Sequence, residues 1–438
     1  MAEETKETQR DVGSNRWFAS QDYTEDTATD LFNERLQRVE DCIALKPVDR
    51  VPIIPFLGTL PYNMYGSSYR DSMYDYEKAG EAMIQYYRDY QPDASIGAAF
   101  NSGKAQELSG IQMIDWPGRP GGTVPDYSIY QVTEREFMMA DEYDEFIHDF
   151  TGFMLNKYLP RVYKNLGGLA KINLFTTRLM SASDGLATLY DPEVIEAFKL
   201  LEKIGEADRE AGAAAAKVSA EISKMGYPPL MTGGGQAPFD VLGDYFRGTV
   251  AILEDQIDYE DKIIEACDVI ADREIQKFQY FKVAKLPCKR VFFPLHKGMD
   301  TFMSPEQYTE MYWKPLKKVV MALIDMGVTP YLYTEGAYAT RLETIADVPE
   351  GKVLYHFENT DMKLAKEVLG GIACIDGNLP LYVLEYGTPD EVREAVKRLL
   401  DDAMDGYGYM FNTAAGIDNA SRENMDAMYE TLMEYGVY

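Results

Sequence analysis

The sequence predicts an α/β protein built as a (β/α)8 TIM barrel. Strand-like and helix-like segments alternate along most of the chain, which is the order that a parallel sheet requires. The strand-like segments are near-continuous apolar runs, as is typical of strands that are buried on both faces. No Gly-x-Gly-x-x-Gly fingerprint follows a strand, so the pattern favours a closed barrel over a doubly wound, dinucleotide-binding sheet.

The first elements divide the chain into a short arm and one barrel domain. Residues 1–30 are polar and charged without periodicity, and we expect them to form a flexible or loosely docked N-terminal arm. The barrel domain is expected to span residues 31–438, with a helix from about residue 31 and a first strand within PVDRVPIIPFLG. Further strands are expected at 93–100, 170–176, 228–235, 289–298, 329–336, 352–359, 373–378 and 409–416.

Residues 101–150 are expected to be an insertion after the second strand. Their proline and glycine turns suit a hairpin, and an insertion at this point of a barrel would shape the substrate mouth. Between the later strands the helix starts are readable from their caps. Ser304-Pro305-Glu306-Gln307 and Thr388-Pro389-Asp390-Glu391 combine a capping hydroxyl, proline at the first helical position and a capping-box side chain, and Asp191-Pro192-Glu193 is similar.

Composition excludes several classes of protein. The formal net charge is −29, from 43 basic and 72 acidic residues, which disfavours a nucleic-acid partner because phosphate binding relies on Lys and Arg. The acidity has two open explanations, solubility in a bacterial or archaeal cytosol and steering of a partner protein. No apolar run approaches eighteen residues, so no membrane span is expected. The four cysteines are scattered without a disulfide-like framework, which indicates a reducing compartment and a cytoplasmic location.

Four successive strand ends carry groups that can bind a metal ion. They are His296 in PLHKG, Glu335 in YLYTEG, His356 in VLYHFE and Cys374 in ACIDGN. The carboxyl ends of barrel strands converge around one axis, and carboxylate, imidazole and thiolate are the ligand types of zinc. We therefore predict a metal site of Glu335, His356, Cys374 and His296, in which Glu358 could replace either histidine.

Structural roles remain open for each of these residues. A buried cysteine often acts only as a small apolar side chain, and an acid or histidine at a strand end can cap a helix or pair with an arginine. The turn GGGQAPFD at 233–240 has no lysine and does not match a phosphate-binding loop, so close approach of a ligand to its backbone is expected instead. Asp240, Asp244, Tyr245 and Arg247 follow it and are expected either to reach that ligand or to serve helix packing.

Several segments resemble the uroporphyrinogen decarboxylase superfamily over about residues 35–438. They are KPVDRVPIIPFLG, PPLMTGGGQAPFDVL, GNLP at 377–380 with GTPDEVREAVKRLL, and GYMFNTAAGI with SRENMDAMYET. The resemblance implies a (β/α)8 barrel and one of two activities, haem-pathway decarboxylation or zinc-assisted methyl transfer with a corrinoid. Decarboxylases of the superfamily hold their substrate with the arginines of an Arg-Gln-Ala-Gly-Arg-Tyr segment. Here that stretch is Phe56-Leu57-Gly58-Thr59-Leu60-Pro61-Tyr62, without arginine.

The methyltransferase branch fits better, although its thiolates are missing. The His-x-Cys-Gly motif of the methylcobalamin:coenzyme M methyltransferases becomes Tyr333-Thr334-Glu335-Gly336, and their later cysteine falls near Ala415, so only Glu335 matches a ligand position. A carboxylate ligand makes the metal a harder Lewis acid, which suits an ether oxygen. The chain is therefore similar to the O-demethylase type of corrinoid methyltransferase, and the spacing from Glu335 to His356 agrees with this.

We predict from these features a zinc-dependent methyltransferase that works between a small methylated, methoxy-type substrate and a corrinoid protein, which carries the cobalamin. The alternatives are a decarboxylase of another carboxylate and a non-catalytic tetrapyrrole-binding protein. A homodimer is compatible with the family. The predicted catalytic residues are Glu335, His356 and Asp240, and the predicted substrate-binding residues are Tyr62, Tyr245 and Arg247, with Tyr65 and Trp116 at an aromatic mouth.

Overall fold

A computed structural model of the chain describes residues 25–174 and 186–438. Most of the N-terminal arm predicted for residues 1–30 therefore lies outside the described residues. The helix expected from about residue 31 begins earlier, because α1 spans Glu25–Ile43. None of the helices in the described parts of the chain is long and apolar enough to cross a bilayer.

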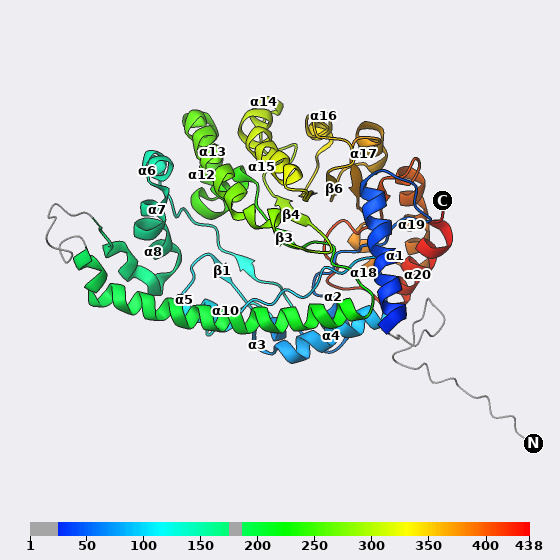
Figure 1. The fold of residues 1–438 in the computed structure, drawn as a ribbon, viewed down its shortest axis with the longest axis horizontal. Helices are drawn as coiled ribbons and strands as arrows, with labels where there is room; N and C mark the ends of the chain where they lie inside the picture. The colour runs from blue at the N-terminus through cyan, green and yellow to red at the C-terminus, as the bar shows by residue number, and fades with distance from the viewer. Residues whose placement is uncertain (1–24, 175–185) are drawn as a thin grey trace, which may run out of the picture.

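In the described residues, six parallel strands form one sheet in the order β3-β4-β5-β6-β7-β8, so each strand pairs with its neighbour in sequence. This order without reversal is the one that a barrel requires, since each crossover helix advances the chain by one strand. Figure 1 shows these strands with helices outside them. The strands are β3 (Gly233–Gly234), β4 (Arg290–Leu295), β5 (Thr329–Thr334), β6 (Leu354–Phe357), β7 (Cys374–Asp376) and β8 (Tyr409–Met410).

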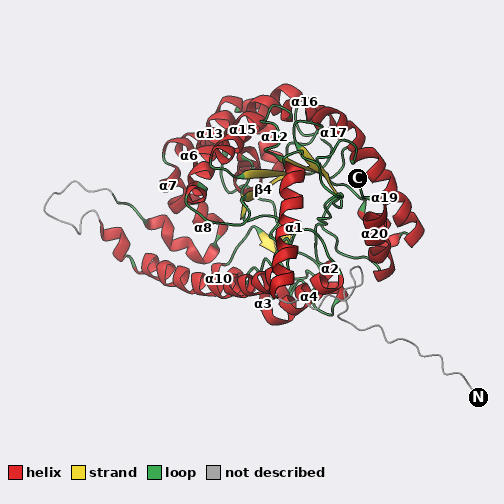
Figure 2. Cartoon of the chain, turned by 45° about the vertical axis from the view of Figure 1, so that its right-hand side comes forward, coloured by secondary structure: helices red, strands yellow, loops and turns green. Residues whose placement is uncertain are grey.

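Two further extended segments complete the ring. Ile53 and Leu57 form parallel bridges with Phe411 and Ile417 beyond β8, and Ser95 forms one with Pro229 before β3. A hydrogen bond from the Asp93 amide to the Ile53 carbonyl, 2.7 Å long, joins the two segments to each other. The first and second predicted strands therefore stand between β8 and β3, and the ring of eight parallel segments agrees with the predicted barrel. In Figure 2 the helices curve around this ring.

The helices outside the sheet follow the predicted capping signals. Ser304 and Thr388 each make the expected capping box, and the Asp191 side chain accepts from the Glu193 amide at the start of α10. The helices that follow β3 are α11 (Pro238–Asp240), α12 (Thr249–Asp258), α13 (Glu260–Lys277), α14 (Pro305–Gln307), α15 (Lys314–Asp325), α16 (Leu342–Ile345), α17 (Met362–Leu369), α18 (Leu381–Tyr386), α19 (Pro389–Ala403) and α20 (Arg422–Tyr435). The 3-10 and π-helical turns among them are η5 (Val241–Arg247), η6 (Gln279–Lys282), η7 (Tyr308–Trp313) and η8 (Ala339–Arg341).

The segment between Ser95 and Pro229 leaves the sheet after the second strand, and we call it the excursion. It is longer than the predicted insertion at 101–150, because the chain returns to the sheet only at Pro229. It contains the expected hairpin, formed by β1 (Ile114–Asp115) and β2 (Gln131–Val132) in antiparallel pairing. The other elements between the first and third barrel segments are α2 (Leu60–Met64), α3 (Asp71–Tyr74), α4 (Tyr76–Asp89), α5 (Gly103–Ser109), η1 (Ala140–Glu142), α6 (Tyr143–His148), α7 (Phe150–Phe153), η2 (Met154–Tyr158), α8 (Leu159–Val162), η3 (Lys164–Lys171), η4 (Ala187–Tyr190) and α10 (Pro192–Lys224).

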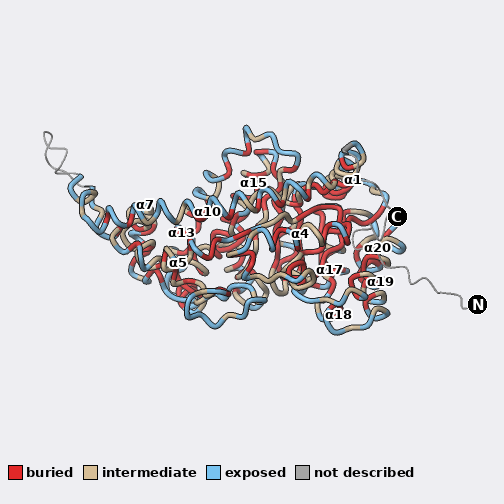
Figure 3. The backbone as a smooth tube through the Cα atoms, turned by 90° about the horizontal axis from the view of Figure 1, so that it is seen from below, coloured by how far each residue is buried: buried red, intermediate tan, exposed pale blue. Residues whose placement is uncertain are grey.

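The strand predicted at 170–176 is wrong over its described residues. Residues up to Lys171 belong to the 3-10 helix η3, and the rest up to 174 has no strand partner in the described chain. Leu166 and Leu169 pack with Ala197 of α10 in a small separate cluster. Within the run, Ile172 is partly buried against this cluster and Leu174 is 58% exposed, and residues 175–176 lie outside the described residues. Figure 1 shows α10 running along the lower side of the molecule beneath this excursion, and Figure 3 shows buried segments concentrated around the barrel.

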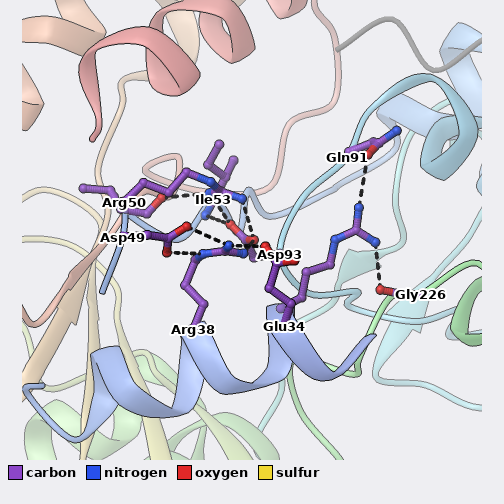
Figure 4. Close-up of polar contacts among 10 residues, drawn as sticks. Glu34, Arg38, Asp49, Arg50, Ile53, Gln91, Asp93 and Gly226 are labelled. Atoms are coloured by element: carbon purple, nitrogen blue, oxygen red, sulfur yellow. Dashed lines mark hydrogen bonds and ion pairs between the residues drawn. The ribbon is translucent and has the colours of Figure 1, made fainter. Parts of the chain in front are cut away.

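A buried ionic cluster ties α1 to the first two barrel segments (Figure 4). The Asp93 carboxylate is fully buried and accepts from the guanidinium groups of Arg38, at 2.7 Å, and Arg50, at 2.7 and 2.8 Å. It also accepts from the Ile53 amide at 2.7 Å. Burial alone would raise the pKa of Asp93, but the two arginines and this amide outweigh it and lower the pKa. The cluster therefore fixes the register of the first two segments at the amino end of the barrel.

Candidate functional site

A pocket of about 720 Å³ opens at the carboxyl ends of β4 and β5. The barrel side of its lining consists of Asp244 and Tyr245 from η5, His296 after β4, and Glu335 after β5. The opposite side comes from the segments that follow the first and second barrel strands, including the β1–β2 hairpin. A wider hollow of about 920 Å³ between η3 and α10 is lined by residues of the excursion and contains no group from a barrel strand. The pocket at the strand ends is therefore the candidate active site.

Sheet register explains why His296 and Glu335 meet. Leu295 of β4 is paired with Thr334 of β5, and the Glu335 amide donates to the Leu295 carbonyl at 3.2 Å. The next residue of each strand therefore leaves the sheet at the same level. His296 Nε2 lies 3.5 Å from Glu335 Oε1, and both side chains are partly exposed to the pocket.

The carboxylates of Asp244 and Asp240 fix the position of His296 on the side away from Glu335. The Asp244 Oδ2 atom lies 2.6 Å from His296 Nδ1, and its Oδ1 atom accepts from the buried Lys297 ammonium group. Asp240 is fully buried one turn earlier and accepts from the amides of His296 and Lys297, each at 2.9 Å, and from the Tyr312 hydroxyl at 2.6 Å. These contacts fix both the backbone and the ring of His296.

Asp240 therefore positions His296 in this structure, and its role as a catalytic acid or base stays a prediction. Its two oxygens are occupied by protein donors, and it does not line the pocket. Burial, together with the charge of Asp244, raises the pKa of Asp240 to about 6. It is consequently still ionised at neutral pH, as its three donors require.

The same carboxylates control the charge of His296. Burial by itself would lower the pKa of His296, but the hydrogen bond with Asp244 and the charges of Asp240 and Glu335 outweigh it and raise the pKa to about 9. Asp244 shows the converse effect: burial opposes its ionisation, but His296 and Lys297 lower its pKa. In the metal-free protein His296 is therefore protonated at neutral pH, with one proton directed to Asp244 and the other toward Glu335.

We expect the substitution Asp244→Asn to lower the pKa of His296 by about 1 to 2, because an ionised partner at hydrogen-bond distance is lost. The chain has three histidines, so NMR titration of ¹³C-labelled histidine can resolve them. The control is Asp376→Asn, which alters the partner of His356 and should leave the resonance that titrates at about 9 unchanged. An unchanged titration in Asp244→Asn would contradict the arrangement.

With this geometry in hand, comparison with known proteins identifies the family. The sequence profile described as "Uroporphyrinogen decarboxylase (URO-D)" matches residues 189–435, which is more than half of the chain. The chain belongs to the uroporphyrinogen decarboxylase family. The match covers β3 to β8 and therefore includes His296 and Glu335 of the pocket.

Curated relatives align over shorter stretches. A uroporphyrinogen decarboxylase from Syntrophotalea carbinolica is 30% identical over 115 residues, which are 26% of this chain and 33% of that protein. One from Dichelobacter nodosus is 29% identical over 140 residues, 31% of this chain and 38% of that protein. The chain thus spans only 33% and 38% of the lengths of these two relatives.

A solved structure described as a methyltransferase from Methanosarcina mazei shares the fold over nearly the full length. Its TM-score is 0.54 at 15% sequence identity, and the match covers 92% of this chain and 98% of the other. At this identity the likeness shows the fold alone.

The polar groups of the pocket fit a divalent metal only in part. Two ligands of a tetrahedral zinc ion, each about 2.1 Å from it, lie roughly 3.4 Å apart. His296 Nε2 and Glu335 Oε1 are separated by 3.5 Å, and Asp244 on Nδ1 is the outer carboxylate that zinc-binding histidines usually have. In the described residues, however, no group of three or more His, Cys, Asp or Glu side chains is arranged to hold a metal. Glu358 is a further carboxylate close enough for its charge to help raise the pKa of Glu335, after burial, and its Oε2 atom accepts a hydrogen bond from the Gly336 amide.

Cys374 does not belong to this site, and its prediction as a ligand is wrong. Cys374 of β7 pairs with Leu354 of β6, which in turn pairs with Tyr331 of β5. Cys374 is therefore level with a residue four positions before Glu335. Four residues of strand span about 13 Å. The fully buried Cys374 sulfur instead lies 3.8 Å from the Cys42 sulfur of α1, and burial, followed by this neighbour, raises its pKa well above the usual value. It packs as a thiol in the barrel interior.

His356 also faces the barrel interior, without joining Glu335. Its Nδ1 atom lies 2.5 Å from Asp376 Oδ1, and its Nε2 atom lies 3.0 Å from the carbonyl oxygen of Ala414. A carbonyl oxygen only accepts, so Nε2 carries a proton and has no lone pair for a metal. The ring stacks on Tyr333 with centroids 4.2 Å apart. The predicted metal and catalytic roles of His356 are therefore not supported by this arrangement; the ring is part of a buried polar network with Asp376 and Asn412.

Of the predicted substrate residues, only Tyr245 lines the pocket. Arg247 is buried and bound to Asp255 and Glu136, which locks η5 to α12 and to the excursion. Tyr62 is buried in α2, the Tyr65 hydroxyl donates to Asp89 at 2.7 Å, and the Trp116 indole donates to Tyr74 at 3.0 Å. The prediction that these residues form the mouth is wrong, because each serves packing within the excursion or around α4.

The glycine-rich turn at 233–240 also has a different role from the expected one. A Cβ atom on Gly235 would come within 2.3 Å of the Phe293 ring, so the missing side chain makes room for a protein ring and not for a ligand. The sequence analysis considered Asp244 and His296 separately and did not predict that they pair. It also did not predict that tyrosines of the excursion line the pocket. Only contact between distant segments reveals either group.

Proposed function

We propose that this protein is a methyltransferase that transfers a methyl group between a small methylated compound, with a methoxy group as the reacting part, and a corrinoid protein. The proposal rests on the pair of His296 and Glu335 at the mouth of the barrel, whose Nε2 and Oε1 atoms are 3.5 Å apart. Asp244 orients the His296 ring through its Nδ1 atom. The pair supports binding of a divalent metal, and Glu358 is the third donor in this proposal. Zinc held there would act as a Lewis acid toward the ether oxygen, and the cobalamin of the partner protein would accept the methyl group.

The residues of the chain have separate tasks in this reaction. Asp240 and Asp244 fix His296, so that its Nε2 atom faces the pocket. Lys297 compensates the charge of Asp244 without entering the pocket lining. The C–O bond of the substrate breaks, the methyl group goes to the acceptor, and the oxygen keeps the bonding pair and takes up one proton. That proton comes from solvent, while Glu335 beside His296 serves as a metal ligand in this proposal.

The alternative activity is decarboxylation of another carboxylate, and the names of the two curated relatives favour it. The pocket argues against it. None of the described lining residues is a lysine or arginine, whereas a substrate with several carboxylates needs cationic partners. Methyl transfer is therefore the function that the pocket supports better.

The experiment is to incubate the zinc-loaded protein with cob(I)alamin and a methoxyphenol, and to follow methylcobalamin by its absorbance. We expect methylcobalamin to form, activity to be lost after chelation, and zinc to restore it. Full activity in protein shown by metal analysis to contain no divalent metal would contradict the metal-dependent mechanism. Formation of coproporphyrinogen from uroporphyrinogen, without methyl transfer, would establish the alternative.

A further inference from the structure

The pocket has an unusual combination of aromatic and acidic groups. Among its described lining residues are five tyrosines, namely Tyr69, Tyr130, Tyr158, Tyr163 and Tyr245. Its titratable lining also includes the carboxylates of Glu134, Asp244 and Glu335, and the described lining contains no lysine or arginine. The nearest cation behind the wall, Lys297, is buried and bound to Asp244. His296 is thus the sole cationic group among the described lining residues, which include three carboxylates, and two of these, Asp244 and Glu335, lie against it.

The tyrosines form one group around the cavity. Tyr163 and Tyr245 lie near enough to Tyr158 to help raise its pKa, after burial. Tyr130 has the same effect on the pKa of Tyr69 and of Tyr245, again after burial. Among the described residues no protein partner accepts a hydrogen bond from the hydroxyls of Tyr158, Tyr163 or Tyr245. Burial raises the pKa of Tyr245 to about 12, so its ring stays neutral and electron-rich at physiological pH. Neutral tyrosine faces attract an organic cation and give no comparable attraction to an anion.

The carboxylates lie at both ends of this group. Asp244 and Glu335 stand at the strand ends beside His296. Glu134 follows the exposed strand β2 of the hairpin and accepts from the Thr249 hydroxyl at the start of α12. A positively charged group among the tyrosines would therefore lie between acids at either end. A carboxylate would meet like charges at both ends, and the one opposite charge, on His296, already faces Asp244 and Glu335.

We propose that the pocket selects a substrate that carries an ammonium-type positive charge in addition to the methyl group that is transferred. The identity of this compound as the substrate rests on the proposed function; the charge selectivity rests on the lining residues alone. Tyr158, Tyr163 and Tyr245 hold the cationic group by their ring faces, and Glu134 supplies the outer negative charge.

Isothermal titration calorimetry with metal-free protein at pH 7.5 tests this inference with three ligands of nearly equal shape. They are choline, its neutral isostere 3,3-dimethyl-1-butanol, and the anion 3,3-dimethylbutanoate. We expect choline to bind at least about ten-fold more tightly than the alcohol, and the carboxylate to bind least. Equal binding of choline and the alcohol, or tighter binding of the carboxylate, would overturn the proposal.

Two variants locate the effect. Tyr158→Leu and Glu134→Gln should each weaken choline binding by at least about three-fold while changing binding of the alcohol less, because one removes a ring face and the other a charge. Glu134 is exposed, so its variant tests the charge even if the Tyr158 variant fails to fold. The matched control is Tyr386→Leu, since Tyr386 is 78% exposed on α18 and does not line the pocket. Retention of the choline preference in both pocket variants would place the cation elsewhere and refute the assignment.

These measurements need neither zinc nor a corrinoid, so their outcome is separate from that of the methyl-transfer assay. Selective choline binding without methyl transfer to any acceptor would leave the pocket assignment intact and refute the proposed function. Demethylation of neutral methoxyphenols without selective choline binding would support the proposed function and refute the assignment of the pocket to a cationic substrate.

Discussion

The substitution Asp93→Asn is expected to lower the free energy of unfolding by about 3 to 5 kcal/mol, as is usual when one partner of a buried ionic group is removed. The carboxylate is fully buried and compensates Arg38 and Arg50, whose side chains are only 5% and 11% exposed. An amide accepts fewer hydrogen bonds and carries no charge, so both guanidinium groups would remain buried without their counter-ion. Since most domains are stable by about 5 to 15 kcal/mol, urea titration should show a large shift of the midpoint.

The control is Asp49→Asn, because Asp49 pairs with the same Arg38 but its side chain is 63% exposed. We expect that change to cost no more than about 1 kcal/mol, as exposed ion pairs do. The sign of the pH dependence is also determined. Because the pKa of Asp93 is depressed in the folded state, its contribution is present above the ordinary value of 3.8 and is lost as the pH falls below it. Similar losses for the two variants would contradict the central role of Asp93.

The substitution Glu335→Gln is expected to lower kcat/KM for methyl transfer by at least about 100-fold and to reduce bound zinc. Loss of an outer partner of a zinc ligand commonly costs 10- to 100-fold in affinity or activity, so loss of the ligand itself should cost more. Glutamine keeps the size of the side chain but removes the charge that faces His296 at 3.5 Å. The pKa of His296, which Glu335 helps to raise, should fall in the same variant.

Cys374→Ala is the matched control for this experiment. Cys374 lies against Cys42 in the interior and should change neither zinc content nor kcat/KM in folded protein. Metal analysis of both variants, together with methylcobalamin formation, separates the two residues. If Cys374→Ala loses zinc and Glu335→Gln retains it, the site proposed at the ends of β4 and β5 is wrong.

Most of the barrel was predictable because its signals are local. Apolar runs at 289–298, 329–336, 352–359 and 373–378 correspond to β4 to β7, and the capping residues Ser304 and Thr388 begin helices as expected. The run at 170–176 misled the prediction because a short apolar run at the end of a 3-10 helix has the same composition as a short strand, although of its described residues Ile172 is the one packed against the cluster with α10. The length of the excursion was missed for the same reason.

The sequence by itself determined the order of strands and helices, and it determined that His296 and Glu335 end adjacent strands, because both properties follow from local spacing. Only the tertiary structure decided which of the candidate ligands meet. Register sets Cys374 about 13 Å below Glu335 and turns His356 toward Asp376, while it brings Asp244 from η5 onto His296. It also decided that tyrosines of the excursion face the strand ends. These are contacts between segments far apart in the chain, and their pairing depends on the packing of the whole barrel.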